Sequence, residues 1–299
     1  MKKKISSVTV FRKNIFSDNP ENVYEGEEII YSKTFYNENE KVIREEKYMP
    51  DESVEHIYDF KYNEKNQLIE EILYHEEDEI AERKTFEYDE SGRLSKEFRH
   101  YLDESFDTII FVYDESGNLI EKNSFDSDNN AEGKEIMTYE NGKIVKKNIF
   151  DTDGQLIYES IYEYDDKGNE LQMSIWDKEE DLKRKYMFDN NEHGKKYLSR
   201  IFNEKDQLIA RNAYEYNEKG LVSEIIEEDA STKNILKLIY DENENIICEE
   251  EYSDQDQLKS SVKRKFNEDN VIIESEIYNF QPNDATEHRH IMRYDYQYF

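Results

Sequence analysis

The sequence is poor in the residues that staple or interrupt a chain: it has one cysteine, three prolines and nine glycines in 299 residues. Cys248 has no second cysteine with which to form an internal disulfide. A small apolar core without disulfides favours a reducing compartment, so we expect a cytoplasmic bacterial protein. The prolines, Pro20, Pro50 and Pro282, lie towards the ends, and none falls between residues 51 and 281.

Long hydrophobic runs are also missing. No stretch approaches the roughly 18 apolar residues that a membrane helix needs. The first residues, MKKKISSVTVFRK, begin with lysines, but Ser6, Ser7 and Thr9 interrupt the apolar run that a signal peptide would have. We therefore predict a first β-strand there and no contact with membranes.

Positive charge is scarce, because 40 Lys and Arg face 72 Asp and Glu and leave a formal net charge of −32. This excess argues against nucleic acids, anionic membranes and acidic substrates, and it would attract a basic partner. A mean hydropathy of −1.06 with such charge is typical of disordered chains. The 24 tyrosines and 15 phenylalanines point instead to a folded β-protein, because aromatic residues favour strands and bury large areas.

A repeat runs through most of the chain. YDESGRL at 88–94 returns as YDESGNL at 113–119: an aromatic residue, an acid, a glycine four positions later and an aliphatic residue at the sixth. Asp and Asn open turns through their own backbone, and glycine tolerates positive φ. The pattern predicts hairpin turns with these structural residues: Asp89, Gly92, Asp114, Gly117, Gly142, Gly154, Gly168 and Gly220.

The repeat predicts an all-β fold, because its apolar positions recur with period two. We expect an extended antiparallel β-meander of roughly 20 short strands, arranged as a solenoid or an open half-shell. The even spacing of Tyr88, Leu94 and Phe98 places all three on one face. We expect a single domain over 1–299, with an N-terminal cap at 1–23, repeats at 24–280 and a C-terminal cap at 281–299. Whether the sheet closes on itself is left open.

The repeat unit resembles the YD repeats of the Rhs and teneurin families. The copies that carry the resemblance are YDESGRL (88–94), YDESGNL (113–119), FDTDGQL (150–156) and YDDKGNEL (164–171), and it extends over about residues 31–278. In Rhs proteins such repeats form a β-shell around a toxin. The chain also resembles, in style, small repeat proteins of bacterial toxin–immunity loci, such as the MORN-like YwqK antitoxin family. It departs from YD repeats in its longer period and in its many glycine positions filled by Asn, Asp or Glu.

No motif predicts catalysis, a metal or a cofactor. The acidic stretch DSDNNAEGKE (126–135) alternates oxygen ligands like a calcium loop, but Ala131 stands where that loop needs glycine and Met137 where it needs glutamate. His288 and His290 lack a third ligand nearby. The acids beside Cys248 raise a thiol pKa, which disfavours a nucleophile. We predict that the chain is not an enzyme.

Two groups of side chains are candidates for binding a partner. Acidic runs would attract a basic surface, although such runs also protect sheet edges from aggregation. Tyrosines outside the repeat register are potential interface anchors. The candidates are Glu76, Glu77, Asp78, Glu79, Glu227, Glu228, Asp229, Glu249, Glu250, Glu251, Tyr31, Tyr58, Tyr186 and Tyr197.

Together these features favour an immunity protein, an antitoxin that covers the active site of a basic toxin domain. A nuclease is the expected class, because its substrate groove must be basic. The alternatives are a structural YD-type shell segment and a secreted surface protein that recognises glycans. The sequence does not indicate the oligomeric state.

Overall fold

The computed structural model describes residues 3–19, 22–76, 79–281 and 286–299, and it confirms the all-β prediction. Twenty-two antiparallel strands form one sheet, where roughly 20 were expected. The described residues contain no helix, and so none that could cross a membrane. The strands are β1 (Ile5–Asn19), β2 (Asn22–Tyr36), β3 (Val42–Tyr48), β4 (Val54–Tyr62), β5 (Leu68–Glu76), β6 (Glu79–Tyr88), β7 (Leu94–His100), β8 (Phe106–Tyr113), β9 (Leu119–Phe125), β10 (Ala131–Glu140), β11 (Lys143–Phe150), β12 (Leu156–Tyr164), β13 (Glu170–Asp177), β14 (Leu182–Asn190), β15 (Lys196–Phe202), β16 (Leu208–Tyr216), β17 (Val222–Asp229), β18 (Lys233–Tyr240), β19 (Ile246–Tyr252), β20 (Leu258–Phe266), β21 (Ile272–Gln281) and β22 (Thr286–Tyr298).

The chain divides into two compact units. The first contains residues 1–82, 216–226 and 232–299, and the second contains residues 83–215 and 227–231. Inside each unit, consecutive strands are joined by short loops and pair with their sequence neighbours, as expected of a meander.

Each unit is a single layer of sheet. In the described residues the strands contact only the strands to which they are hydrogen-bonded, and nothing packs across either face. Few apolar side chains are therefore fully removed from water, and most others are half-buried against their neighbours in the sheet. The buried apolar residues are Val8, Ile57, Ile72, Met137, Cys248 and Met292.

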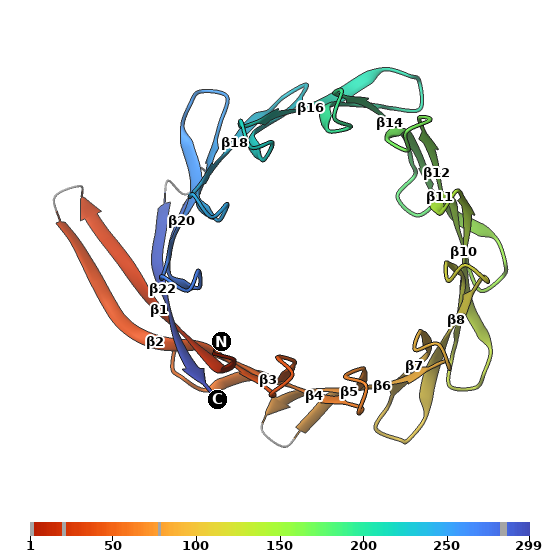
Figure 1. Ribbon diagram of the computed structural model, residues 1–299, viewed down its shortest axis with the longest axis horizontal. Helices are drawn as coiled ribbons and strands as arrows, with labels where there is room; N and C mark the ends of the chain where they lie inside the picture. Colours follow the sequence, from red (N-terminus) through yellow and green to blue (C-terminus); the bar gives the residue numbers. More distant parts are fainter. Residues whose placement is uncertain (1–2, 20–21, 77–78, 282–285) are drawn as a thin grey trace. The chain divides into compact units, whose positions relative to one another are not determined.

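The first and last strands of the chain pair with each other, so the prediction of an open solenoid or half-shell was wrong. β1 pairs with β2 along one edge and with β22 along the other, and β1 and β22 lie side by side in Figure 1. Arg293 in β22 donates two hydrogen bonds, of 3.0 and 2.7 Å, to the carboxylate of Glu28 in β2. The predicted caps, 1–23 and 281–299, thus contain the two strands that join the ends of the sheet.

The repeated turns share one geometry. The N–H of Gly92 donates to the carbonyl of Asp89 at 2.9 Å, and the carboxylate of Asp89 accepts the N–H of Arg93 at 2.8 Å. Asp114 holds the next such turn in the same way. The third residue after the turn-opening residue has positive φ, which suits glycine. The turn glycines at this position with positive φ are Gly92, Gly117, Gly154, Gly168, Gly194 and Gly220, and Gly142 has positive φ in a two-residue turn.

Two opposite substitutions test this turn geometry. Gly117 has a φ of 87° and open space where a Cβ would stand, so Gly117→Ala meets only backbone strain and should lower the free energy of unfolding by about 1 kcal/mol. Glu104 has a φ of 69° in the matching turn position, so Glu104→Gly should raise stability by about 0.5 kcal/mol. Urea unfolding measures both, and shifts of the same sign would contradict this geometry.

A bulge beside most turns changes which face the next aromatic occupies. Tyr88 pairs with Leu94, but the following pair is Glu87 with Lys96, so the register slips by one residue. Phe98 therefore lies opposite Thr85, on the face away from Tyr88, and the expectation from even spacing was wrong. The same slip recurs after most turns, so aromatics at successive turns alternate between the two faces.

Tyrosines at the ends of even-numbered strands bond to the neighbouring strand. The hydroxyl of Tyr113 donates to the carbonyl of Leu94 at 2.9 Å, beyond the last backbone pair of β7 and β8, which joins Lys96 to Ile110. Each such bond satisfies a carbonyl that the backbone pairing does not reach. The same bond is made by Tyr62 to Val42, Tyr164 to Ile144, Tyr240 to Val222 and Tyr296 to Ile272.

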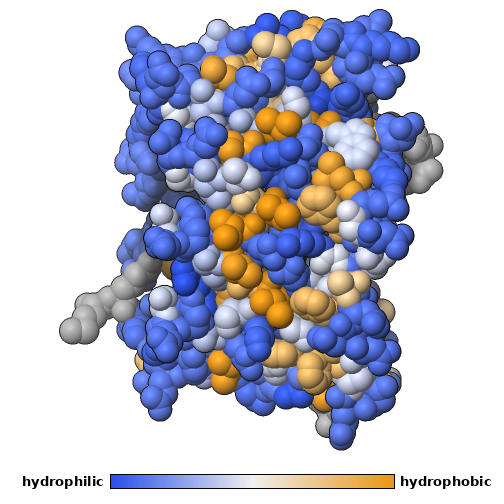
Figure 2. All heavy atoms as spheres, turned by 90° about the vertical axis from the view of Figure 1, so that its right-hand side faces the viewer, coloured by the Kyte–Doolittle hydropathy of each residue, from blue (hydrophilic) through white to orange (hydrophobic). Residues whose placement is uncertain are grey.

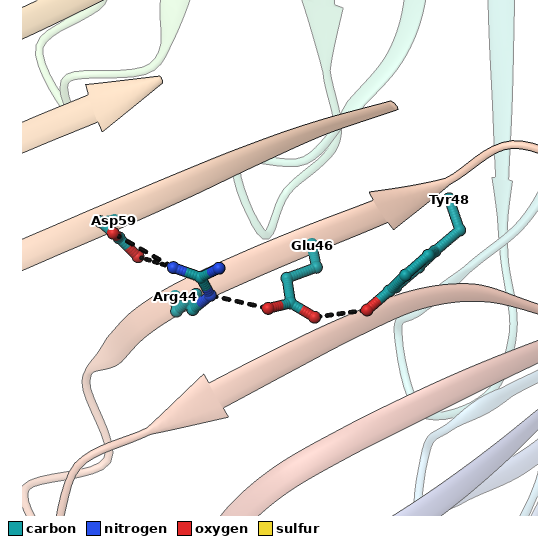
Figure 3. A network of polar contacts seen from close by, with 4 residues as sticks. All are labelled: Arg44, Glu46, Tyr48 and Asp59. Carbon is teal, nitrogen blue, oxygen red and sulfur yellow. Dashed lines mark hydrogen bonds and ion pairs between the residues drawn. The ribbon is translucent and has the colours of Figure 1, made fainter. Parts of the chain in front are cut away.

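Polar networks support the faces that lack a second layer. In Figure 3, Arg44 donates to Glu46 at 2.7 Å and to both carboxylate oxygens of Asp59 on β4 at 3.0 and 3.2 Å. Tyr48 donates to the other oxygen of Glu46 at 2.5 Å. Burial raises the pKa of Glu46, but the hydrogen bonds from Tyr48 and Arg44 outweigh it and hold the pKa below its usual value. The carboxylate therefore stays charged and holds Arg44, whose guanidinium links β3 to Asp59 of β4.

Candidate partner-binding site

The two loop ends of the second unit differ in charge. The odd-numbered strands β7 to β15 all finish at one end of the unit, which we call the odd-loop end. We call the opposite end the even-loop end. The five loops of the odd-loop end (101–105, 126–130, 151–155, 178–181 and 203–207) carry eleven acids and two lysines. The five loops of the even-loop end (89–93, 114–118, 141–142, 165–169 and 191–195) carry seven acids and three basic residues. The odd-loop end is therefore the more negative.

A large apolar residue opens the second strand of four of the five hairpins at the odd-loop end, but the hairpin of β9 and β10 lacks one. Phe150 pairs with Leu156, Phe202 with Leu208 and His100 with Phe106. In β10 the equivalent residue opposite Phe125 is Ala131, and Gly133 follows two residues later. A Cβ on Gly133 would stand 3.2 Å from the carbonyl oxygen of Phe150, so a side chain there would require the neighbouring backbone to shift slightly.

These small residues leave a hollow of about 360 Å³ on the sheet face, which we call the β9–β12 hollow. Apolar side chains form most of its wall: Phe125, Ala131, Ile136 and Phe150. Figure 2, which looks onto the part of the sheet that holds β8 to β12, shows apolar groups along the middle of the face in view and hydrophilic side chains at both of its sides. The hollow is thus an apolar depression beside an acidic margin.

One cation lines the β9–β12 hollow and is already paired. The ammonium group of Lys134 lies 2.8 Å from the carboxylate of Glu121, which also accepts a hydrogen bond of 2.8 Å from Asn123. These hydrogen bonds, from Lys134 first, lower the pKa of Glu121. Lys134 therefore adds little net charge to the hollow.

The acids around the β9–β12 hollow fall into two groups. Asp126 and Asp151 accept backbone N–H bonds of 2.7 to 3.0 Å inside their own turns. The bonds from Asn130 hold the pKa of Asp126 below its usual value. Asp128, Glu132 and Asp153 are exposed, and their carboxylates form no hydrogen bond or ion pair with other described residues. Their charges remain available to a partner.

A second hollow lies at the even-loop end and has a different character. It measures about 1020 Å³, and three lysines, Lys143, Lys146 and Lys167, line it together with acids. Lys143 stands over the ring of Tyr164 at 5.1 Å, and Lys146 pairs with Glu159 at 2.7 Å. Its lysines make it less suitable for a basic partner than the β9–β12 hollow.

The acidic runs singled out from the sequence lie on separate strands, and several of their members are paired. Arg264 bonds to Glu249, Tyr252 donates to Glu250 at 2.8 Å, and Lys259 pairs with Glu251 at 2.8 Å. Arg211 bonds to Glu228 at 2.7 Å, whereas Glu227 is exposed.

The remaining acidic residues lie at turns. The carboxylate of Asp229 accepts a hydrogen bond of 2.7 Å from the backbone N–H of Ser231 in the following turn. Glu79 is exposed at the start of β6. Glu77, Asp78 and the side chain of Glu76 lie outside the described residues.

Of the tyrosines proposed as interface anchors, only Tyr197 is well exposed, at 46%. Tyr31 is half-buried under the ammonium group of Lys47, and Tyr58 stacks on Phe60 with ring centroids 6.1 Å apart. Tyr186 is also half-buried. Tyr31 and Tyr58 belong to the first unit, whereas Tyr186 and Tyr197 belong to the second unit, which contains the acidic loops.

No group of three or more metal-ligating side chains occurs among the described residues. Burial, followed by the charge of Glu250, raises the pKa of Cys248. Burial, followed by Arg12 and His288, lowers the pKa of His290. The raised pKa keeps the thiol of Cys248 protonated, and the lowered pKa favours the neutral imidazole of His290.

Sequence reasoning missed the β9–β12 hollow, although a signal was present. Ala131 breaks the run of large apolar residues that open the even-numbered strands from β8 to β16, and Gly133 is the strand glycine beside it. The stretch was instead considered as a calcium loop. A departure from the repeat, rather than the repeat itself, marks the site.

A family described only as an uncharacterised protein matches residues 65–178, less than half of the chain. No curated protein matches this chain. Similar solved structures include a porin-like protein from Bacteroides uniformis, with 9% identity, a TM-score of 0.35, and coverage of 98% of this chain and 96% of that one. Another is the TcdB2-TccC3 complex, with 10% identity, a TM-score of 0.31, and coverage of 91% and 19%. At these TM-scores the likenesses establish neither a shared fold nor a function.

Proposed function

We propose that this chain is a non-catalytic binding protein that captures a basic protein on the odd-loop end of the second unit. The observation that carries the proposal is the excess of eleven acids over two lysines in the five loops there. Such a surface steers a cationic partner into contact and discriminates against anionic ones.

The biological role we propose is that of an immunity protein in a reducing compartment. A nuclease toxin must hold nucleic acid in a basic groove, and the acidic loops would take the place of the phosphates. Covering the groove would block the active site without any chemistry by the inhibitor. The resemblance of the repeat to toxin–immunity proteins agrees with this role.

Inhibition of toxin domains encoded beside the gene tests the proposal. We expect one basic toxin domain to lose its activity at a one-to-one ratio with this chain, and the complex to weaken at least about tenfold between 50 and 500 mM salt, because exposed charges are screened. A salt-insensitive complex would contradict the electrostatic basis. Absence of inhibition by any basic toxin domain would favour a structural or glycan-binding role.

A further inference from the structure

The β9–β12 hollow lies where Ala131 takes the place of the large apolar residue that opens the second strand of the other four hairpins at the odd-loop end, and its shape suggests what fills it. The hairpins on both sides close with a large pair at this position, Phe150 with Leu156 and His100 with Phe106. At this position Ala131 has a methyl group where the neighbouring hairpins have a large side chain. The wall that remains is mainly apolar. A ring-sized apolar side chain from outside would restore the missing contact.

The surroundings of the hollow specify the residues next to that side chain. Asp128 lies in the loop that joins the lining residues Phe125 and Ala131, and Glu132 and Asp153 are next in sequence to lining residues. All three are exposed, and their carboxylates have no partner among the described residues. Residues beside an inserted side chain would face these carboxylates, and lysine or arginine would gain most from that position. An acidic segment, including the loops of a second copy of this chain, would be repelled.

We infer that the β9–β12 hollow receives one aromatic side chain of the basic partner, from a segment in which lysine or arginine flanks that aromatic. The inference rests on the proposed capture of a basic protein and names the side chain by which that protein is anchored. The acidic loops attract the segment, and the hollow selects it, because apolar burial in a fitted depression discriminates between side chains where long-range charge does not.

Two synthetic peptides of equal charge test the anchor: Lys-Lys-Arg-Phe-Arg-Lys-Lys and the same peptide with serine in place of phenylalanine. We expect the phenylalanine peptide to bind about tenfold more tightly, by calorimetry or fluorescence anisotropy, from the area that the ring buries. Ala131→Leu places the missing side chain in the hollow and should abolish this difference. It should leave the stability of the protein unchanged or raised, because it restores the pair that neighbouring hairpins have.

Ala81→Leu is the matched control, because Ala81 is an exposed strand residue in β6 of the other unit. It should keep the tenfold preference. Equal binding of the two peptides, or no binding of either, would overturn the anchor. A preference that survives Ala131→Leu would overturn it as well. The inhibition assay with whole toxin domains tests the proposed function separately, because capture by charge alone does not require the aromatic anchor.

Discussion

Val8→Asp should destabilise the protein by at least about 3 kcal/mol, because it places an unpaired carboxylate where the two ends of the sheet join. Val8 is 9% exposed and pairs with Tyr296 of β22 on one side and Thr34 of β2 on the other. The charge would face the buried side of this junction and would have no cation directly opposite. Urea unfolding measures the loss.

Val112→Asp is the control for this change. Val112 is 38% exposed in β8, so the same substitution should cost about 1 kcal/mol at most, chiefly through strand propensity. If Val8→Asp does not fold, Val8→Thr provides a smaller step of about 1 to 3 kcal/mol from its buried hydroxyl. Equal costs at the two valines would contradict the pairing of β1 with β22.

Alkaline pH should unfold the protein through its tyrosines. Burial, followed by neighbouring tyrosines, raises the pKa of Tyr296 to about 12, and burial likewise raises the pKa of Tyr164 and Tyr240. A group whose pKa is raised by folding stabilises the fold in its protonated form. This contribution is complete below pH 10, the ordinary pKa of tyrosine, and is lost as the pH rises through about 12. An ionised hydroxyl also cannot donate to the carbonyl that it holds.

Comparison of the wild type with Tyr296→Phe isolates this effect from the titration of lysines. At pH 7 the variant lacks the bond of 2.7 Å to the carbonyl of Ile272 and should be less stable by about 1 kcal/mol. As the pH rises to 12 the two stabilities should converge, because only the wild type loses this hydroxyl proton. A difference that stays constant from pH 7 to 12 would show that Tyr296 does not contribute to the alkaline transition.

Local features of the fold could be predicted from the sequence, because turn chemistry acts over a few residues. The turn at Asp89 and Gly92 follows from the preferences of these residue types alone. The face of Phe98 could not be predicted, since a bulge of one residue reverses the parity without changing the spacing of apolar residues. The pairing of β1 with β22 joins the two ends of the chain, and no periodicity reports on it.

The candidate site was harder to predict for the same reason. The acids of the odd-loop end look in sequence like ordinary turn residues, and they form one surface only because alternate loops share an end of the sheet. The run Glu249 to Glu251 is conspicuous in sequence, yet in the strand its members alternate between faces and find partners. Strand register therefore decided which acids are available, and register is set by bulges.

Neutralisation of matched acid pairs at the two loop ends tests most directly whether the odd-loop end captures the basic partner. Asp128→Asn with Asp153→Asn removes two exposed charges there, and Glu90→Gln with Glu115→Gln removes two from the even-loop end. Stopped-flow association with the inhibited toxin domain at low salt should slow severalfold for the first pair and remain unchanged for the second. Equal slowing by both pairs, or slowing by the second pair alone, would contradict capture at the odd-loop end.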